Sequence, residues 1–563
     1  MSGAEIIAKI LKKMGVRKVF VFPGGTVAPL LDALLKEKIK YFCARNEQGS
    51  GYAAIGAAKI TGFPQVVIVT SGPGATNVLT PVADAYYDSV PLLVFTGQVG
   101  TESINYAKKV RQTGFQETDT VGIFKPITKS SRILSDSDDI SKIIYESFIL
   151  AKSGRPGPVL VDLPMDVQRE EHKYNTFKLD RSKIVRRKKV GNFKKLDKLI
   201  SNAKRPLILA GNGVYISQTV KYVREFAEKF GIPVVSSLPG VGIMPSIHPL
   251  YFGFIGHTGE YFANLAMCYA DLLIVLGARL DLRQTGTEIR SFKNNKKIVR
   301  IDIDKNELEF GRVKGDLNIN LDLSVFFREY FCKNHKLKRK TSDWIKKING
   351  WKNKFHSSQF FKDYSISSYD IIKSVDKITR YRNVIVSSGV GIHQQFVPRI
   401  FTFNYPKRIW LTSAGHGTMG FDIPSNIGAV LVKKNAMGIV FVGDGSFQMN
   451  IQELATIKEK NLPIKIFVMD NRRLGLVSQF QLLTFGSDPT TGNKKNPSFS
   501  KIARAYGLRS FEISKKSQIN SVVEKVFSDL FPALVHCHID PCEDVLPMLL
   551  TGQKLNEMYP FKG

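Results

Sequence analysis

Short apolar runs rich in β-branched residues alternate with helix-like segments along most of this chain, and many of the runs end in a glycine-rich turn. Strands this apolar are buried on both faces of a sheet, so they must be parallel strands covered by helices on each side. The alternation appears in three successive blocks. It predicts an α/β protein with three consecutive doubly wound parallel-sheet domains.

The blocks suggest where the domains begin and end. We expect a first domain over residues 1–170, a central domain over 199–330 and a third domain over 369–563 with its C-terminal tail. The intervening stretches, 171–198 and 331–368, are expected to be basic linkers. A chain of 563 residues is long enough for three such cores.

The formal net charge of +32 would suit a protein that binds nucleic acid. Residues 173–205 carry a net of +11 and residues 333–354 a net of +8, so two stretches at the joins hold +19 of the total. Neither contains a zinc-finger spacing or an aromatic RNA-binding strand. The distribution favours solvated linkers, with a nucleic-acid-binding protein on a degenerate enzyme scaffold as the alternative.

Composition also bears on location. The 5 cysteines are few, odd in number and mostly far apart, which argues against a secreted disulfide framework. No apolar run reaches the roughly 18 residues of a membrane span, and the first residues lack a signal-peptide core. These features predict a cytoplasmic protein.

The strongest chemical signal lies in the third block. Asp444 follows one apolar strand, flanked by Gly443 and Gly445, and Asn471 ends the next strand, 27 residues later. A carboxylate and an amide at the ends of adjacent strands can bind one hard cation, and the glycines allow close approach of a phosphate. Mg²⁺ bridging to a diphosphate suits this arrangement.

This pattern resembles the signature of thiamine-diphosphate enzymes, and nearly the whole chain resembles their acetolactate synthase (acetohydroxyacid synthase) large-subunit group. The resemblance implies a pyrimidine-binding, a central FAD-type and a diphosphate-binding domain, in that order. It implies that Asp444, Asn471 and the backbone carbonyl of Arg473 bind Mg²⁺. Further cofactor contacts are implied for Val390, Gly391, His393, Gly417, Met419, Gly443, Gly445, Ser446 and Gly475.

Several of these positions have specific roles by resemblance. His393 would donate to the diphosphate, the carbonyl of Gly417 would accept from the pyrimidine amino group, and Met419 would hold the two rings in a bent conformation. His416 replaces the apolar residue expected there.

In the first block, Glu47 matches the catalytic glutamate that protonates the pyrimidine ring, and Gly24, Gly25 and Gln98 match cofactor contacts. Phe115 and Gln116 match residues that line the substrate side of the thiazolium. Asn46 stands where the family normally has His.

The segment 99–114, between Gln98 and Phe115, is longer than expected for this group and contains Lys108, Lys109 and Arg111. Such an insertion would suit an acceptor larger or more anionic than pyruvate, while a tolerated surface-loop insertion is the alternative. Phe480 replaces a Trp that favours 2-ketobutyrate in many members.

The central block resembles the flavin-binding domain of the group. FAD contacts are implied for Gly211, Gly213, Ser237, Leu238, Gly256, Gly277, Ala278, Arg279, Asp281, Arg283, Asp302 and Ile303. A structural rather than catalytic FAD, or its loss, remains open. A metal at His536, Cys537, His538 and Cys542 is not expected, because His536 and His538 would lie on one face of a strand and Cys537 on the other.

The predicted function is a thiamine-diphosphate-dependent carboligase that decarboxylates pyruvate and adds the acetyl unit to a carbonyl acceptor. Pyruvate, 2-ketobutyrate or the keto group of a nucleotide-activated sugar could be that acceptor. The family builds its active site between subunits, so a homodimer is the expected minimum, with a tetramer as an alternative. The need for a regulatory subunit stays open, and neither nucleic acid nor membrane is expected as a partner.

Overall fold

The computed structural model describes residues 1–104, 110–175, 193–332, 341–361, 364–491 and 495–561. It divides into two compact units, and each is described by itself. Unit 1 contains residues 1–186, 413–434 and 447–464; unit 2 contains residues 187–412, 435–446 and 465–563.

Unit 1 is built on a six-stranded sheet of order β2-β1-β3-β4-β6-β5, in which all neighbouring pairs are parallel. Its strands are β1 (Lys18–Phe22), β2 (Lys40–Cys43), β3 (Gln65–Val69), β4 (Leu92–Gln98), β5 (Ser130–Ile133) and β6 (Pro158–Pro164). Its helices are α1 (Gly3–Lys13), α2 (Ala28–Lys36), α3 (Glu47–Thr61), α4 (Pro73–Asn77), α5 (Leu79–Tyr87), α6 (Thr120–Phe124), α7 (Ile140–Lys152), α8 (Met165–Arg169), α20 (Asp422–Val432) and α22 (Glu453–Glu459).

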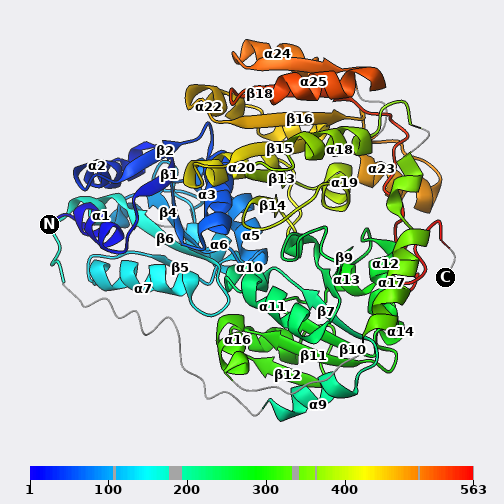
Figure 1. The fold of residues 1–563 in the computed structure, drawn as a ribbon. Coiled ribbons are helices and arrows are strands. Elements are labelled where there is room, and N and C mark those ends of the chain that lie inside the picture. The colour runs from blue at the N-terminus through cyan, green and yellow to red at the C-terminus, as the bar shows by residue number, and fades with distance from the viewer. Residues whose placement is uncertain (105–109, 176–192, 333–340, 362–363, 492–494, 562–563) are drawn as a thin grey trace. The chain divides into compact units, whose positions relative to one another are not determined.

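Helices cover both faces of this sheet. Figure 1 shows α1 and α7 on one face and α3 and α5 on the other. Local signals set the helix ends: a capping box between Ser2 and Glu5 starts α1, and the Asn46 side chain accepts from the backbone of Gly49 to start α3. Helix α20 packs on α3 at very short range, because a Cβ on Gly56 would lie 1.8 Å from the carbonyl oxygen of Ser425.

Unit 2 contains two further six-stranded sheets. The central sheet has β7 (Pro206–Ala210), β8 (Val234–Ser236), β9 (Tyr251–Phe254), β10 (Leu272–Leu276), β11 (Lys297–Asp302) and β12 (Leu317–Asn320). The C-terminal sheet has β13 (Val384–Ser388), β14 (Arg408–Thr412), β15 (Met437–Gly443), β16 (Ile464–Asp470), β17 (Arg509–Ile513) and β18 (Ala533–His538).

The helices of unit 2 are α9 (Lys194–Asn202), α10 (Gly213–Ile216), α11 (Val220–Phe230), α12 (Tyr261–Tyr269), α13 (Leu282–Thr285), α14 (Ile289–Lys293), α15 (Lys305–Glu309), α16 (Leu323–Phe331), α17 (Ser342–Lys354), α18 (Ser368–Thr379), α19 (Ile392–Ile400), α23 (Gly475–Phe485), α24 (Phe499–Ala505) and α25 (Ile519–Val526). Helix α21 (Asp444–Met449) spans the boundary between the two units.

Strand order differs between the sheets in an informative way. The C-terminal sheet, β14-β13-β15-β16-β18-β17, repeats the order of the unit 1 sheet. The central sheet, β12-β11-β10-β7-β8-β9, has the order of dinucleotide-binding folds, in which the ligand crosses the sheet where the strand order reverses. The predicted fold class, three parallel α/β sheets with interleaved helices, is confirmed.

The segment expected as the second basic linker, 331–368, differs from that expectation. Helix α17 lies within it, and Trp344 and Ile348 of this helix are buried. The Trp344 indole donates to the carbonyl of Pro206 at 3.0 Å, so α17 packs on the central sheet while its lysines remain on the outside. The basic residues 186–189 and 338–340 lie outside the described residues.

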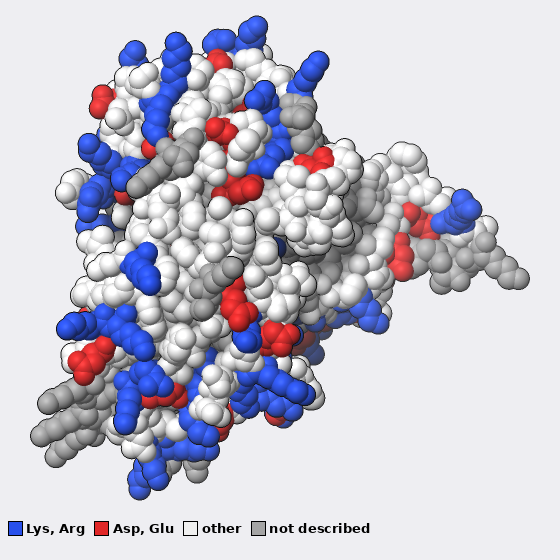
Figure 2. Space-filling view, turned by 90° about the vertical axis from the view of Figure 1, so that its right-hand side faces the viewer, with Lys and Arg blue, Asp and Glu red and all other residues white. Residues whose placement is uncertain are grey.

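The surface carries its positive charge in more than one place. Figure 2 shows Lys and Arg in several separate groups on the visible face, with Asp and Glu between some of them. All five cysteines are unpaired. Among the described residues, no helix has the length and apolar character needed to cross a membrane.

Candidate active site

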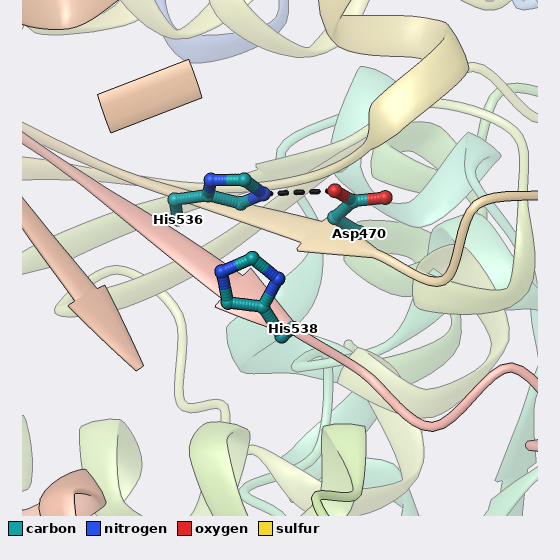
Figure 3. A group of neighbouring side chains, drawn as sticks. All are labelled: Asp470, His536 and His538. Carbon is teal, nitrogen blue, oxygen red and sulfur yellow. Dashed lines mark hydrogen bonds and ion pairs between the residues drawn. The ribbon is translucent and has the colours of Figure 1, made fainter. Parts of the chain in front are cut away.

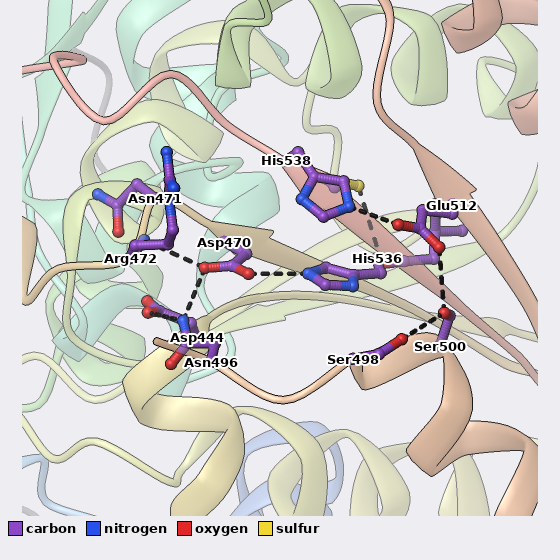
Figure 4. A network of polar contacts seen from close by, with 12 residues as sticks. Asp444, Asp470, Asn471, Arg472, Asn496, Ser498, Ser500, Glu512, His536 and His538 are labelled. Atoms are coloured by element: carbon purple, nitrogen blue, oxygen red, sulfur yellow. Dashed lines mark hydrogen bonds and ion pairs between the residues drawn. The ribbon is translucent and has the colours of Figure 1, made fainter. Parts of the chain in front are cut away.

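In unit 2, acidic and amide side chains gather where β15 and β16 end. Asp444 directly follows β15, Asp470 is the last residue of β16 and Asn471 follows it. The amide nitrogen of Asn496 donates to Asp444 at 2.6 Å and to Asp470 at 2.8 Å, so one side chain joins both carboxylates (Figure 4). Burial raises the pKa of Asp444 to about 6, despite the hydrogen bond from Asn496.

A histidine pair continues this network across the neighbouring strands. His536 donates to Asp470 at 2.8 Å, and His538 contacts Glu512 of β17 at 2.6 Å. Asp470, His536 and His538 form a compact group, and the two rings lie 4.2 Å apart on one face of β18 (Figure 3). Cys537 is buried on the opposite face, as predicted. In this structure each histidine faces a carboxylate partner.

The donor set at the end of β15 fits Mg²⁺. Asp444 and Asn471 are both buried and supply a carboxylate and an amide oxygen, the ligand types that this ion prefers. The Arg473 side chain points elsewhere, to Asp544 at 2.7 Å, while its backbone nitrogen donates to the Asn471 amide oxygen. This leaves the Arg473 backbone, rather than its cation, beside Asn471.

The predicted diphosphate turn lies next to these residues. Gly391 is the N-cap of α19 after β13, and the backbone nitrogen of Gly443 donates to Nε2 of the buried His393 at 3.4 Å. Helix α23 begins at Gly475, where a Cβ would lie only 2.2 Å from Ile392. Strands β13 and β15 flank the point where the strand order of the sheet reverses, the place where such folds bind phosphates. The structure thus brings Gly391, His393, Gly443 and Gly475 together, with Val390, Gly445 and Ser446 adjacent in the chain.

In unit 1, Glu47 is the first residue of α3 and is buried. Its carboxylate accepts from the side-chain amide of Asn77 at 2.6 Å. Gly74, in α4, lies beside the same carboxylate. Gly24 and Gly25 follow the neighbouring strand β1, and a Cβ on Gly24 would meet Thr70. These residues lie at the carboxyl ends of adjacent parallel strands.

The predicted substrate-side residues differ from one another in exposure. Phe115 is 85% exposed, whereas Gln116 has a left-handed backbone, with φ of 65°, and its side chain accepts from Ser71 at 3.2 Å. Gln98 is fully buried, and its amide donates to Asp162 at 2.9 Å and to the carbonyl of Thr118 at 2.8 Å. Gln98 therefore supports the segment after Gln116; a direct contact with a cofactor stays a prediction.

The insertion 99–114 ends on a buried acid. The carboxylate of Glu117 accepts from the backbone of Thr113 at 2.5 Å and of Gly114 at 3.1 Å. Arg111 is exposed, and Lys108 and Lys109 lie outside the described residues.

In the central sheet, the predicted FAD residues follow the carboxyl ends of five strands. Gly211 and Gly213 after β7 lie against Gly277 after β10, where a Cβ on Gly211 would be 2.2 Å from the Gly277 carbonyl oxygen. The buried hydroxyl of Ser237, after β8, has no hydrogen-bond partner among the residues that the structure describes. An adenine dinucleotide fits this switch point, which offers close backbone approach and a free hydroxyl. The other predicted residues are Leu238, Gly256, Ala278, Arg279, Asp281, Arg283, Asp302 and Ile303.

Two residues of these sites were not among the predicted ones. Asn496 lies in a loop 25 residues beyond Asn471, with no local motif to mark it, and Asn77 contacts Glu47 from a separate helix. Only the hydrogen bonds in the folded chain identify them. Gly417 and Met419 lie after β14, in a segment of unit 1.

Comparison with known proteins agrees with this arrangement. Three family models match: the thiamine pyrophosphate enzyme N-terminal TPP binding domain over residues 1–123, the central domain over 193–329 and the C-terminal TPP binding domain over 389–537. The acetolactate synthase large subunit of Lactococcus lactis subsp. lactis is 39% identical over 99% of this chain and 96% of its own length. The isozyme 2 large subunit of Escherichia coli is 34% identical over 99% of both chains.

The matched segments contain the residues described above, including Glu47, Asp444 and Asn471. Matches of this extent support the enzyme rather than the nucleic-acid-binding alternative. The chain belongs to the acetolactate synthase large-subunit family of thiamine pyrophosphate enzymes and is a thiamine-diphosphate-dependent carboligase.

Proposed function

We propose that this enzyme decarboxylates pyruvate and adds the remaining two-carbon unit to a second carbonyl compound. The acceptor proposed first is a second molecule of pyruvate. The observation that carries this proposal is the cluster of Asp444, Asn471, His393 and Gly443 at the switch point of the C-terminal sheet. A metal-bound diphosphate fits that cluster.

The chain's own residues then have distinct tasks. Asp444, Asn471 and the Arg473 carbonyl would hold Mg²⁺, while His393 and the backbone at Gly391 and Gly443 would hold the diphosphate. When bound, thiamine diphosphate supplies a carbon nucleophile for the keto group of pyruvate. Val390, Gly445, Ser446 and Gly475 complete the contacts that the family implies.

Glu47 would hold and release the proton at the pyrimidine ring nitrogen. Its burial and the hydrogen bond from Asn77 keep the carboxylate in one orientation, as a proton donor requires. Gly24, Gly25 and Gln98 would contact or support the pyrimidine side, and Phe115 and Gln116 would line the substrate side.

FAD is proposed as a second cofactor, bound along the carboxyl ends of the central strands. The dinucleotide-type strand order, the close approach at Gly211 and the Ser237 hydroxyl, which no described residue contacts by a hydrogen bond, support it. Arg279 pairs with Asp281 at 3.1 Å, which places its guanidinium beside this edge.

The assembly and location are also proposals. Two copies of the chain would complete the active site, in a dimer or a pair of dimers in the cytoplasm. The relatives are named as large subunits, which favours a smaller partner subunit. The boundaries of the three domains and of the first linker stay predictions.

The test combines a spectrum with product analysis. Purified protein is expected to be yellow and to convert pyruvate to acetolactate when thiamine diphosphate and Mg²⁺ are supplied. Pyruvate is then paired with 2-ketobutyrate or a keto-sugar nucleotide to identify the preferred acceptor. Absence of CO₂ release from pyruvate with both cofactors present would overturn the proposal.

A further inference from the structure

One face at the end of α5 holds the segment 413–418 of unit 1. Asp84, Tyr87 and Asp88 stand three and four residues apart, so they share one side of the helix end. Each of the three contacts the segment, and all of these contacts lie within unit 1. The segment leads directly into Gly417 and Met419, the residues predicted to hold the aminopyrimidine.

Ser413 is the centre of the contact. Its hydroxyl donates to Asp84 and accepts from the backbone nitrogens of Gly417 at 3.1 Å and Thr418 at 2.9 Å. The Thr418 hydroxyl also donates to it, at 3.1 Å. Because the Gly417 backbone is tied to this one oxygen, the place of the Gly417 carbonyl depends on where Asp84 holds Ser413.

Asp88 binds the residues before this turn. Its carboxylate accepts from the backbone of Gly415 at 2.7 Å and of Ala414 at 3.3 Å. Lys59, near the end of α3, donates to the same carboxylate at 2.6 Å. Both aspartates are buried, at 0% exposure for Asp84 and 5% for Asp88, so their bonds to the segment are shielded from water.

His416, the residue that departs from the family pattern, is explained by the same face. Its ring stacks on that of Tyr87, with centroids 5.3 Å apart and planes within 13°. The stack adds a third contact of α5 with consecutive residues of the segment. The histidine at position 416 therefore has a stacking partner, Tyr87, in α5.

Asp84 has an electrostatic cost. Burial and the neighbouring Asp88 carboxylate raise the pKa of Asp84, although Lys59 and Ser413 act in the opposite direction. A carboxylate with a raised pKa lowers stability at neutral pH. Asp84 therefore lowers stability while it accepts a hydrogen bond from the Ser413 hydroxyl. A role in positioning the segment 413–418 explains such an acid better than a role in stabilising the fold.

We propose that Asp84 and Asp88 are positioning residues, which act through Ser413, Gly415 and Gly417 to set the aminopyrimidine-binding segment for its cofactor. The inference rests on the proposed function, because it takes Gly417 and Met419 as cofactor contacts. It adds the end of α5 to the binding site although no residue of α5 need touch the cofactor.

The test measures thiamine diphosphate binding directly, by calorimetry on cofactor-free protein with Mg²⁺, beside KM for the cofactor and kcat. Ser413→Ala and Asp84→Ala are each expected to weaken binding by about tenfold, with a matching rise in KM for the cofactor and a smaller change in KM for pyruvate. Asp84→Asn keeps an oxygen that accepts from Ser413 and is expected to bind within about threefold of wild type. Asp138→Asn, an acid of the same unit bound to Ser135 and Arg132, is the matched control.

The outcomes separate the two proposals. Wild-type protein that neither binds thiamine diphosphate nor releases CO₂ from pyruvate would sink the proposed function. Wild-type binding with unchanged affinity in both Ser413→Ala and Asp84→Ala would overturn only the positioning role. If Asp84→Ala does not fold, Ser413→Ala decides the question, since it removes a single oxygen.

Discussion

The buried carboxylate of Asp470 accepts a hydrogen bond from Nε2 of His536 at 2.8 Å. Asp470 immediately precedes Asn471 and shares the Asn496 amide with Asp444. The bond therefore joins β18 to the edge of the sheet where the metal ligands are expected.

Replacing His536 by Leu should destabilise the protein by about 2 kcal/mol, because the Asp470 carboxylate would stay buried without this donor. Denaturant unfolding measures the loss. His538→Ala is the control: the contact of His538 with Glu512 is about half exposed, and its removal should change stability by no more than about 0.5 kcal/mol. Equal effects for the two variants would contradict the role given to the buried bond.

Replacing Asp444 by Asn should raise the Mg²⁺ concentration needed for half-maximal cofactor binding by at least about tenfold. A neutral amide in place of the carboxylate removes the charge that holds a hard cation. Titration of Mg²⁺ at fixed thiamine diphosphate gives the value. Asp343→Asn, at an exposed site on α17, should behave as wild type.

Glu47→Gln should lower turnover by about 10²–10³ while leaving the melting temperature nearly unchanged. Glutamine keeps an oxygen for the Asn77 amide but cannot release a proton. Steady-state rates with pyruvate provide the measurement, and Glu102→Gln in the same block is an exposed control. Full turnover in the Glu47→Gln protein would remove this residue from the chemistry.

Arg283→Ala should weaken the affinity for the flavin by about tenfold, and so lower the flavin content of the purified protein. Apart from Arg279, Arg283 is the arginine nearest in sequence to the Gly277 turn, and it is exposed. Flavin absorbance per protein after dialysis reports the loss. Arg290→Ala changes an exposed arginine on the following helix and should retain the flavin. Retention by both variants would argue against an FAD contact at Arg283.

Glu543 should make stability depend on pH. Burial raises the pKa of Glu543 to about 8, even though Ser368 donates to its carboxylate at 2.7 Å. Since the unfolded carboxyl ionises near 4.3, its contribution to stability is present below that pH and is lost as pH rises toward 8. Glu543→Gln should therefore flatten the fall in stability between pH 5 and pH 8, by up to a few kcal/mol. Identical pH profiles for wild type and variant would contradict the assignment.

The inner strands could be predicted from sequence because their residues are buried on both faces. β7 and β10 are apolar throughout, and β3 is apolar after Gln65, a pattern visible without any tertiary information. The edge strands β5, β12 and β17 carry polar residues, since one side of each faces less of the core, and β5 and β12 are only four residues long. Helix α17 was hidden for a related reason: its lysines dominate the composition, and only packing shows that Trp344 is buried.

The sequence by itself determined the fold class, the family and the cofactor motifs, because parallel α/β sheets place turn residues such as Asp444 and Asn471 at the ends of recognisable apolar strands. Only the tertiary structure decided which distant side chains form hydrogen bonds with the residues of these motifs. Asn496 reaches Asp444 from 52 residues away, and Asp84 reaches Ser413 from 329 residues away. Such pairs leave no local pattern, because a hydrogen bond depends on distance in space and not on separation along the chain.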